Sequence, residues 1–249
     1  MATDREKDIL NFLNEKSPLS VEELAASLYV SEVTVRRDLA AMEKKGMIVR
    51  KRGGASLPEL GFEPMFNQRQ KKNNELKQSI AKYVANTIQE GEVIALDVGT
   101  TTAELARELT KRSGITVFTS CIQVASILAK SNLQVYMIGG LIRKTEMSMV
   151  GSIAQETIRK FTFDRFYLGV AGINLETGLT DYSIEETEVK RAFIDRSKRV
   201  IALVDRTKFG HSSLIQVCEA EQIDEMITNK GDFGGELPED HFKGKITYV

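Results

Sequence analysis

The sequence is poor in the residues that build metal centres and disulfide frameworks. Its 249 residues include two cysteines, Cys121 and Cys218, and two histidines, His211 and His241. The cysteines lie too far apart in the sequence for a zinc-ligand motif, and two alone make no disulfide framework. A reducing compartment is the simplest setting for such a chain. We therefore expect no metal site, no cofactor and no disulfide.

Long hydrophobic runs are also missing. No apolar segment approaches the roughly 20 residues that a membrane-spanning helix needs. The first ten residues, MATDREKDIL, are charged and helical in pattern, unlike a secretory signal peptide. Hydrophobic residues make up 42% of the chain and charged residues 28%, ordinary values for a folded globular protein. We expect a soluble cytoplasmic protein that makes no membrane contact.

The net charge is close to zero, but the basic residues are unevenly distributed. The chain has 34 basic and 35 acidic residues, a formal charge of −1. The range 31–57 nevertheless carries seven basic against three acidic side chains. A local basic patch on a neutral chain is typical of a modular DNA-binding protein. Charge alone leaves a second interpretation open, a solvated charged face.

The chain begins with three predicted helices. Thr3 with Glu6, and Ser20 with Glu23, show the capping-box spacing, and apolar residues at helical spacing follow each pair. Ser31 can cap a third helix, because apolar side chains recur along one side of the segment that follows it. Three helices are therefore expected before the basic segment ends.

The connection between the second and third helices is very short. Tyr29 and Val30 alone remain between them, and a turn this tight is typical of a helix-turn-helix. Gly46 can end the third helix. The segments Met47–Lys51 and Ala55–Leu57, joined by a double-glycine turn, then predict a β-hairpin. Three helices and a hairpin make a winged helix-turn-helix.

The third helix is the predicted reader of DNA, because in this motif it enters the major groove. With its apolar side turned inward, Val33 and Arg37 lie nearly opposite, flanked by Thr34 and Arg36. An arginine here can bond a guanine at O6 and N7, and Val33 can contact a thymine methyl. The basic hairpin residues suit phosphates or a minor groove. The predicted helix-turn-helix spans Ser20 to Leu39. The predicted DNA-binding residues, in this motif and in the hairpin that follows, are Ser20, Ser31, Val33, Thr34, Arg36, Arg37, Arg50, Lys51 and Arg52. The alternative is a helical dimerisation module with solvated arginines.

From Leu76 onward short strands alternate with helices. A helix is expected from Leu76 until about Gly91, because apolar residues step by four. The predicted strands are Val93–Val98, Ile115–Thr119, Val135–Ile138, Phe166–Val170 and Val200–Val204, with Ile246–Val249 as a further edge strand. This alternation predicts βα units and a mainly parallel sheet. We expect a winged helix-turn-helix over 1–57, a linker over 58–75 and a Rossmann-like α/β domain over 76–249.

The segment Ala95–Thr102, ALDVGTTT, predicts a strand, a glycine turn and a helix that begins with hydroxyl residues. The first turn of a helix leaves backbone N–H groups free and carries about half a positive charge. Thr100, Thr101 and Thr102 add hydroxyl donors, and Gly99 lets the backbone come close to a ligand. A phosphate or a carboxylate suits this geometry, although an ordinary capped turn would have the same pattern. It is not a nucleotide P-loop, since no Lys-Ser/Thr pair follows a GxxxxG.

Further polar residues are expected at the carboxyl ends of the strands, where open α/β sheets bind ligands. They are Gly139, Gly140, Asp181, the cluster of Glu188, Lys190 and Arg191, and Asp205 with Lys208. Each alone is more often structural: Asp205 can cap a turn, and Lys190 can be a solvated helix residue. Their convergence on one edge depends on the predicted fold.

Two segments near the N-terminus resemble a known family. Ser20–Leu39, SVEELAASLYVSEVTVRRDL, is similar to the helix-turn-helix of the DeoR family of bacterial transcriptional regulators, and Glu43–Ala55, EKKGMIVRKRGGA, to that family's wing. The resemblance continues through the second domain and so covers nearly the whole chain. It implies repression of carbohydrate-use genes and a response to a metabolite. A homodimer or homotetramer is expected because one winged helix reads only a short half-site.

The second domain resembles the sensor domain of that family in several motifs. They are LDVGTTT, GGLIRKTEMSMVG, FDRFYLGVAGI, GLTD, EETEVKRAFI and ALVDRTKFG. The resemblance implies a fold similar to ribose-5-phosphate isomerase and an effector that is a phosphorylated sugar. It also implies that Asp97, Gly99 and Thr100–Thr102 hold the phosphate, while Lys190, Asp205 and Lys208 face the sugar. Many members have asparagine where this chain has Ser120, so an amide contact there is not expected.

The isomerase likeness raises the question of catalysis. The isomerases carry acidic residues in a DGAD-like turn, whereas the similar segment here, Gly169-Val170-Ala171-Gly172, has no carboxylate. We therefore expect a DNA-binding regulator without catalytic residues, tuned on its operator by a bound phosphorylated sugar. Asp97, Asp181, Glu188 and Asp205 remain as candidate general bases. Two alternatives thus stay open, a sugar-phosphate isomerase or hydrolase with a nucleic-acid module, and a scaffold that uses its helix-turn-helix for protein contacts.

Overall fold

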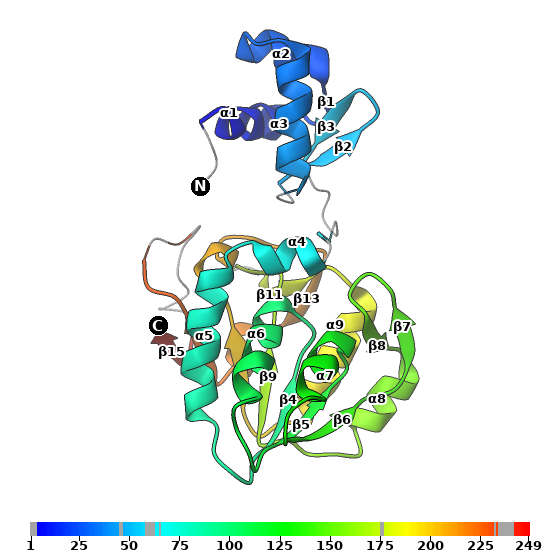
Figure 1. The fold of residues 1–249 in the computed structure, drawn as a ribbon, viewed down its shortest axis with the longest axis vertical. Helices are drawn as coiled ribbons and strands as arrows, with labels where there is room; N and C mark the ends of the chain where they lie inside the picture. The colour runs from blue at the N-terminus through cyan, green and yellow to red at the C-terminus, as the bar shows by residue number, and fades with distance from the viewer. Residues whose placement is uncertain are drawn as a thin grey trace. The chain divides into compact units, whose positions relative to one another are not determined.

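The computed structural model describes residues 4–44, 47–57, 63–64, 66–174, 177–231, 233 and 242–249. The chain divides into two compact units, Met1–Lys72 and Asn73–Val249 (Figure 1). Each unit has a hydrophobic core of its own. The predicted cap at Thr3, the helix end at Gly46 and much of the predicted linker, including Pro58 and Gly61, lie outside the described residues. No helix in the described ranges is long and apolar enough to cross a membrane.

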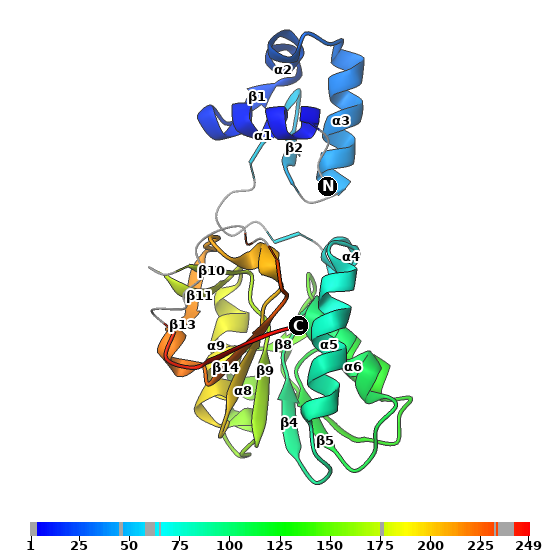
Figure 2. The ribbon, with the colours of Figure 1, turned by 90° about the vertical axis from the view of Figure 1, so that its left-hand side faces the viewer.

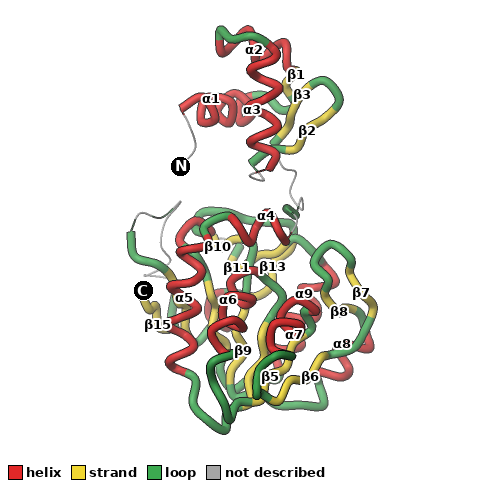
Figure 3. The backbone as a smooth tube through the Cα atoms, in the orientation of Figure 1, coloured by secondary structure: helices red, strands yellow, loops and turns green. Residues whose placement is uncertain are grey.

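The first unit has the predicted helices and hairpin (Figure 3). Its elements are α1 (Asp4–Glu15), β1 (Leu19–Ser20), α2 (Val21–Leu28), α3 (Glu32–Lys44), β2 (Val49–Lys51), β3 (Gly54–Ser56) and α4 (Phe66–Lys71). The strands form an antiparallel sheet in the order β1-β3-β2. Helix α4 lies within the range predicted as a linker.

Apolar residues spaced for helices make the core of this unit. Ile9 of α1, Leu24 of α2, and Val35 and Met42 of α3 are all fully buried. The start of α2 is fixed by a complete capping box: the Ser20 hydroxyl accepts from Glu23 N–H at 3.0 Å, and the Glu23 carboxylate accepts from Ser20 N–H at 2.7 Å. The capping box therefore satisfies two backbone N–H groups at the start of α2.

The second unit alternates strands and helices as expected. Its first half consists of α5 (Asn74–Thr87), β4 (Val93–Leu96), α6 (Thr100–Leu109), β5 (Thr116–Thr119), α7 (Ile122–Leu128), β6 (Gln134–Met137), β7 (Leu141–Arg143), β8 (Ser148–Val150) and α8 (Ser152–Ile158). Its second half consists of β9 (Arg165–Leu168), β10 (Gly172–Asn174), β11 (Gly178–Asp181), α9 (Ile184–Asp195), β12 (Val200–Leu203), the 3₁₀ turn η1 (Arg206–Lys208), β13 (Ile215–Cys218), the 3₁₀ turn η2 (Ala220–Gln222), β14 (Glu225–Thr228) and β15 (Lys245–Tyr248).

A seven-stranded parallel sheet organises this unit, in the order β15-β14-β12-β9-β4-β5-β6. The chain passes from β4 to β5 and β6 in one direction, and from β9 to β12, β14 and β15 in the other. The order therefore reverses between β4 and β9, a topological switch point of the kind at which open sheets bind ligands. The predicted Rossmann-like fold is confirmed.

Helices cover both faces of the sheet (Figures 1 and 2). Helices α5, α6 and α7 pack beside one another on one face, and α8 and α9 on the other. Aromatic rings join the second layer to the sheet: Phe166 of β9 stacks on Phe193 of α9 with ring centroids 5.0 Å apart. Two small antiparallel sheets, β10-β11-β13 and β7-β8, complete the unit and were not expected from the sequence.

Candidate nucleic-acid interface and effector site

Helix α3 separates a buried side from an exposed one. Val35, Leu39 and Met42 lie in the core. Val33 is 76% exposed, and Arg36 and Arg37 are exposed as well. The structure thus places the predicted reading residues on the outer side of the helix.

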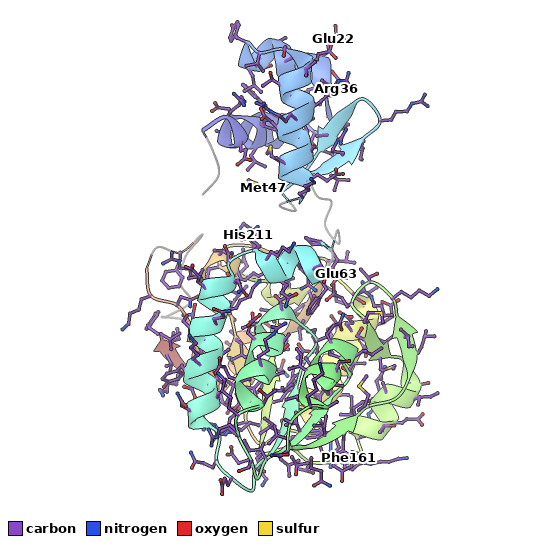
Figure 4. The ribbon with its side chains drawn as sticks, viewed as in Figure 1. Glu22, Arg36, Met47, Glu63, Phe161 and His211 are labelled. Carbon is purple, nitrogen blue, oxygen red and sulfur yellow. The ribbon has the colours of Figure 1, made fainter. Side chains whose placement is uncertain are left out.

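The two arginines of α3 differ in their partners. Arg36, labelled in Figure 4, donates to Glu32 one turn earlier at 2.8 Å. Among the described residues Arg37 has neither an ion pair nor a hydrogen bond from its side chain. Arg5 of α1 donates to the carboxylate of Asp38, the residue after Arg37, at 2.5 and 3.1 Å, which ties α3 to α1. Arg37 is therefore the arginine of α3 that is available for an external acceptor.

The hydroxyl residues assigned to DNA have local roles. Ser20 caps α2, as described above. The Ser31 hydroxyl accepts from Thr34 N–H at 3.3 Å and lies 3.0 Å from the Thr34 hydroxyl, so both residues help to begin α3. These bonds help to position α3.

The wing carries its basic residues on the surface. Arg50 and Lys51 of β2 and Arg52 of the turn are exposed. Arg50 lies 3.8 Å from Glu43, a loose contact. Gly54 cannot carry a side chain here, because a Cβ would lie 2.1 Å from the Leu19 carbonyl of β1. The close approach of β1 and β3 therefore fixes the wing against the start of α2.

A buried ion-pair network occupies the switch point of the second unit. Asp97 follows β4, and Gly169 follows the adjacent β9. The Asp97 carboxylate accepts from Gly169 N–H at 2.9 Å and from the ammonium of Lys190, which reaches in from α9. Lys190 also donates to the Gly169 carbonyl at 3.0 Å and pairs with Asp181 at 3.1 Å. Lys190 and Asp97 are each 1% exposed.

The electrostatics of this network follow from its surplus of carboxylates. Burial works against the charge on Lys190, but the carboxylates around it prevail and raise the Lys190 pKa above its ordinary value. Burial also raises the pKa of Asp97, more strongly than Lys190 lowers it. The raised pKa values mean that the network loses protons less readily than the isolated side chains would. Because the groups are coupled, each titration step belongs to the network and not to one residue. Lys190 is therefore a charged residue that neutralises its neighbours.

Helix α6 begins directly beside the network. Gly99 is its N-cap and offers no side chain to the first helical N–H groups. The Thr102 hydroxyl donates to the carbonyls of Asp97 and Gly99 at 2.8 and 2.9 Å, so it closes the turn. Thr100 and Thr101 are buried, and the described residues give their hydroxyls no partner. The backbone N–H groups of this turn, with these two hydroxyls, make an anion-binding geometry.

Among the described residues, one oxygen of Asp97 has no hydrogen-bond partner. Asp97 Oδ1 is buried and unpaired, whereas Oδ2 accepts from Gly169 and Lys190. Buried polar atoms without partners are rare and call for an explanation. This one lies at the carboxyl edge of the sheet next to the start of α6. The described residues leave this acceptor unused.

The β7-β8 hairpin meets the same network from another side. The Glu186 carboxylate of α9 accepts from the Ser148 hydroxyl of β8 and from Arg143 of β7 at 3.3 Å. Gly140, at the start of the hairpin, has no room for a Cβ, which would lie 2.7 Å from the Val150 carbonyl. Gly139 has open space around it. Close packing therefore requires glycine at position 140, whereas a side chain would fit at position 139.

Other predicted residues have separate partners. Asp205 accepts from Thr207 N–H at 3.1 Å and from its hydroxyl at 2.6 Å, and so caps η1, on which Lys208 also lies. Glu188 and Arg191 pair with each other at 2.8 Å on the exposed side of α9. Of the three clustered residues of α9, Lys190 alone enters the network.

Sequence reasoning missed some members of the network. From the sequence, Gly169 was noted only as part of a segment without a carboxylate. In the structure its N–H donates to Asp97 and its carbonyl accepts from Lys190. Glu186 and its partner Ser148 were not predicted. The available signal was spacing, since Glu186 and Lys190 are four residues apart and so share one side of α9. No group of three or more histidine, cysteine, aspartate or glutamate residues in the described ranges is arranged to hold a metal ion.

Comparison with known proteins agrees with this division of the chain. A family model described as a DeoR-like helix-turn-helix domain matches residues 5–60, and one described as a DeoR C terminal sensor domain matches residues 72–230. Among solved structures, ribose 5-phosphate isomerase A from Methanocaldococcus jannaschii has a TM-score of 0.42 at 17% identity over 55% of each chain.

Similar curated proteins are named as transcriptional regulators. The regulator GolR of Listeria innocua is 36% identical over 91% of this chain and 90% of its own length. The repressor GlcR of Bacillus subtilis is 35% identical over 89% of this chain and 86% of its own. The glycerol-3-phosphate regulon repressor of Escherichia coli is 29% identical over 91% and 90%. The matches to both domain models and these relatives show that the chain belongs to the DeoR family of transcriptional regulators.

Proposed function

We propose that this protein is a repressor whose affinity for an operator in double-stranded DNA is set by a phosphorylated sugar bound in its second unit. Helix α3 and the wing contact the operator, with Arg37 as the base-reading side chain. One winged helix reads a short half-site, so the active form is a dimer or a larger assembly of even symmetry. The names of the relatives, several of which are repressors, support this proposal.

The observation that carries the effector proposal is the arrangement at the β4-β9 switch point. An uncapped helix start, where the described residues give the hydroxyls of Thr100 and Thr101 no partner, lies beside Asp97 Oδ1, for which they give none either. The first suits a phosphate, because N–H groups and the helix dipole favour an anion. The second, Asp97 Oδ1, suits a sugar hydroxyl. A phosphorylated sugar carries both a phosphate and hydroxyl groups, so one such molecule suits both features of the site.

The roles of the implied residues change in this proposal. Asp97 is an acceptor for a hydroxyl and not a phosphate ligand, since its carboxylate repels an anion. Thr102 closes the turn and leaves phosphate contacts to Thr100, Thr101 and the backbone. Lys190 keeps the carboxylates in place and acts on the ligand through them. The 3₁₀ turn capped by Asp205 forms part of the effector site because it lies at the carboxyl end of β12.

Binding without turnover is part of the proposal. The segment after β9, Gly169-Val170-Ala171-Gly172, contains no carboxylate that could act as a general base. Asp97 is engaged by Lys190 on one oxygen, and the described structure gives Asp181 the same partner. A sugar phosphate incubated with the protein should therefore be recovered unchanged, as judged by phosphorus and proton NMR.

A thermal-shift screen against phosphorylated sugars, with the free sugars alongside, tests the effector site. Specific binding stabilises the protein by about 2.7 kcal/mol at a hundredfold excess over the dissociation constant. We expect one phosphate ester to raise Tm while its free sugar does not. The variant Thr101→Glu should lose the shift through charge repulsion, and Thr101→Val should weaken it through the lost hydroxyl.

The matched control is Thr157→Glu, which adds the same charge on the exposed surface of α8. It should keep the full shift. If no phosphorylated compound raises Tm, or if Thr101→Glu responds like wild type, the effector site is not at the start of α6.

A further inference from the structure

One exposed side chain of the first unit lies in a backbone conformation that does not suit it. Tyr29, between α2 and α3, has φ 55° and ψ 40°, in the left-handed region. Glycine enters this region freely and asparagine tolerates it, whereas a bulky side chain is disfavoured there. Tyr29 is also 96% exposed, so its ring packs against almost nothing in the unit.

The end of α2 explains the backbone but not the side chain. The Tyr29 N–H points at the Ala25 and Ala26 carbonyls, and the Val30 N–H donates to the Ala25 carbonyl at 3.1 Å. This is the Schellman arrangement, whose left-handed residue is usually glycine. A tyrosine here adds strain to the helix end and gains no packing. Strain without an internal reason points to a role outside the chain.

The place of Tyr29 in the motif indicates what it meets. In a helix-turn-helix the N-terminal part of the third helix enters the major groove, while the preceding helix crosses the sugar-phosphate backbone. Tyr29 lies where α2 ends and the chain turns into α3, four residues before the exposed Val33. We infer that the Tyr29 hydroxyl donates a hydrogen bond to a DNA phosphate at the edge of the groove. This inference rests on the proposed DNA-binding function.

The acidic side chains near this turn, Glu23 and Glu32, are already paired with basic residues, and the Tyr29 hydroxyl is an uncharged donor. Glu23 is paired with Lys16 at 2.7 Å, and Glu32 with Arg36 at 2.8 Å. Tyrosine is among the side chains that bond phosphates, and its hydroxyl adds no positive charge. Contacts to phosphate carry no sequence information, so this one strengthens binding to the operator and to random DNA alike.

The test uses the full chain and a fluorescent duplex of random sequence at low salt, with affinity read from anisotropy. Tyr29→Phe keeps the ring and removes the hydroxyl, and should weaken binding about tenfold. Tyr83→Phe, an exposed tyrosine of α5, should bind as wild type does. The slope of log affinity against log salt should be unchanged in Tyr29→Phe, because no cation is lost, whereas Arg52→Ala should lower it by about one.

A second variant separates the contact from the fold. Tyr29→Asn suits the left-handed backbone, so its Tm should rise while its DNA affinity falls at least as far as that of Tyr29→Phe. A Tyr29→Phe variant that binds like wild type overturns the inference, and so does a lower Tm for Tyr29→Asn, since the ring would then be packing within the fold. A wild-type protein that retains no duplex at all overturns the proposed function itself, so the two failures are distinguishable.

Discussion

Lys190 is the residue on which the switch point depends. Its ammonium is the cation that faces Asp97 and Asp181, and all three side chains are buried. A buried pair adds little stability over a hydrophobic replacement, but removal of one partner leaves the other charge uncompensated. The residue is therefore more important for the integrity of the site than its pairing energy suggests.

Lys190→Met should lower the free energy of unfolding by about 3–5 kcal/mol, measured by urea denaturation. The double variant Lys190→Met with Asp97→Asn should recover part of the loss, because one stranded charge is removed. Lys198→Met is the control, since Lys198 forms an exposed ion pair with Asp164 and its removal should change little. Equal losses in Lys190→Met and Lys198→Met would contradict the role of the network.

Arg37 is the predicted source of sequence preference. Arg37→Ala should cost about 1–3 kcal/mol of discrimination between the operator and random DNA, as expected for a bidentate guanine contact. An operator selected from random duplexes with the wild-type protein supplies the probe. Arg36→Ala serves for comparison, because Arg36 is already engaged by Glu32 and should lose less. Undiminished discrimination in Arg37→Ala would defeat the assignment.

The two cysteines should be unreactive in the folded protein. Burial raises the pKa of Cys121 to about 11 and that of Cys218 to about 12. Because the thiolate is the reactive form, raised pKa values leave both groups as neutral thiols at neutral pH. Iodoacetamide at pH 8 should modify neither until urea unfolds the chain, as followed by mass spectrometry. Rapid labelling of the native protein at either position would show that it opens readily.

At the scale of elements, the capping box of α2 fixes the geometry of the helix-turn-helix. Ser20→Ala removes the acceptor for Glu23 N–H and should lower stability by about 1 kcal/mol. Ser27→Ala, on the exposed surface of the same helix, should be neutral or slightly stabilising, because alanine is the better helix former. Urea denaturation of both variants checks this pair, and a Ser20→Ala variant as stable as wild type would mean that packing alone sets the start of α2.

Most strands of the parallel sheet could be predicted from the sequence, because their apolar runs are self-evident. Segments such as VIAL in β4 and β12 are buried along almost their whole length. Strand β14 was missed because it contains Glu225, whose carboxylate pairs with Arg199 and with Lys245 and Thr247 on the neighbouring β15. Pairing over that sequence distance cannot be read from a local pattern. Strand β1 was missed because two residues form no pattern at all.

The site was predictable as a list of residues but not as a network. Asp97, Asp181 and Lys190 were each singled out, and the fold brings them together. Their mutual pairing was not foreseen, because it joins residues up to 93 positions apart. Asp205 was assigned to the sugar with a turn cap as the alternative, and the structure shows the cap. Sequence gives the chemical types present, while partners depend on tertiary contacts.

At the scale of the whole molecule, each unit has its own core, so each can present a site without the other. A regulator needs the two sites to be coupled, and coupling is a difference in effector affinity between DNA-bound and free protein. Thermodynamic linkage makes the effect reciprocal. A sugar phosphate that lowers DNA affinity by some factor must itself bind more weakly, by the same factor, when the protein is on DNA.

The phosphate ester that raises Tm should therefore change the dissociation constant for a selected operator by about 5- to 150-fold, the range typical of coupled sites. Calorimetric titration of the same ester into free protein and into the protein-operator complex should give an equal ratio. Thr101→Glu should bind the operator normally but show no response, since it lacks the ligand and keeps α3 and the wing. If the ester binds with one affinity to both forms and leaves operator binding unchanged, the second unit holds the sugar phosphate for a purpose other than the control of DNA binding, because a ligand without preference for either state shifts no equilibrium.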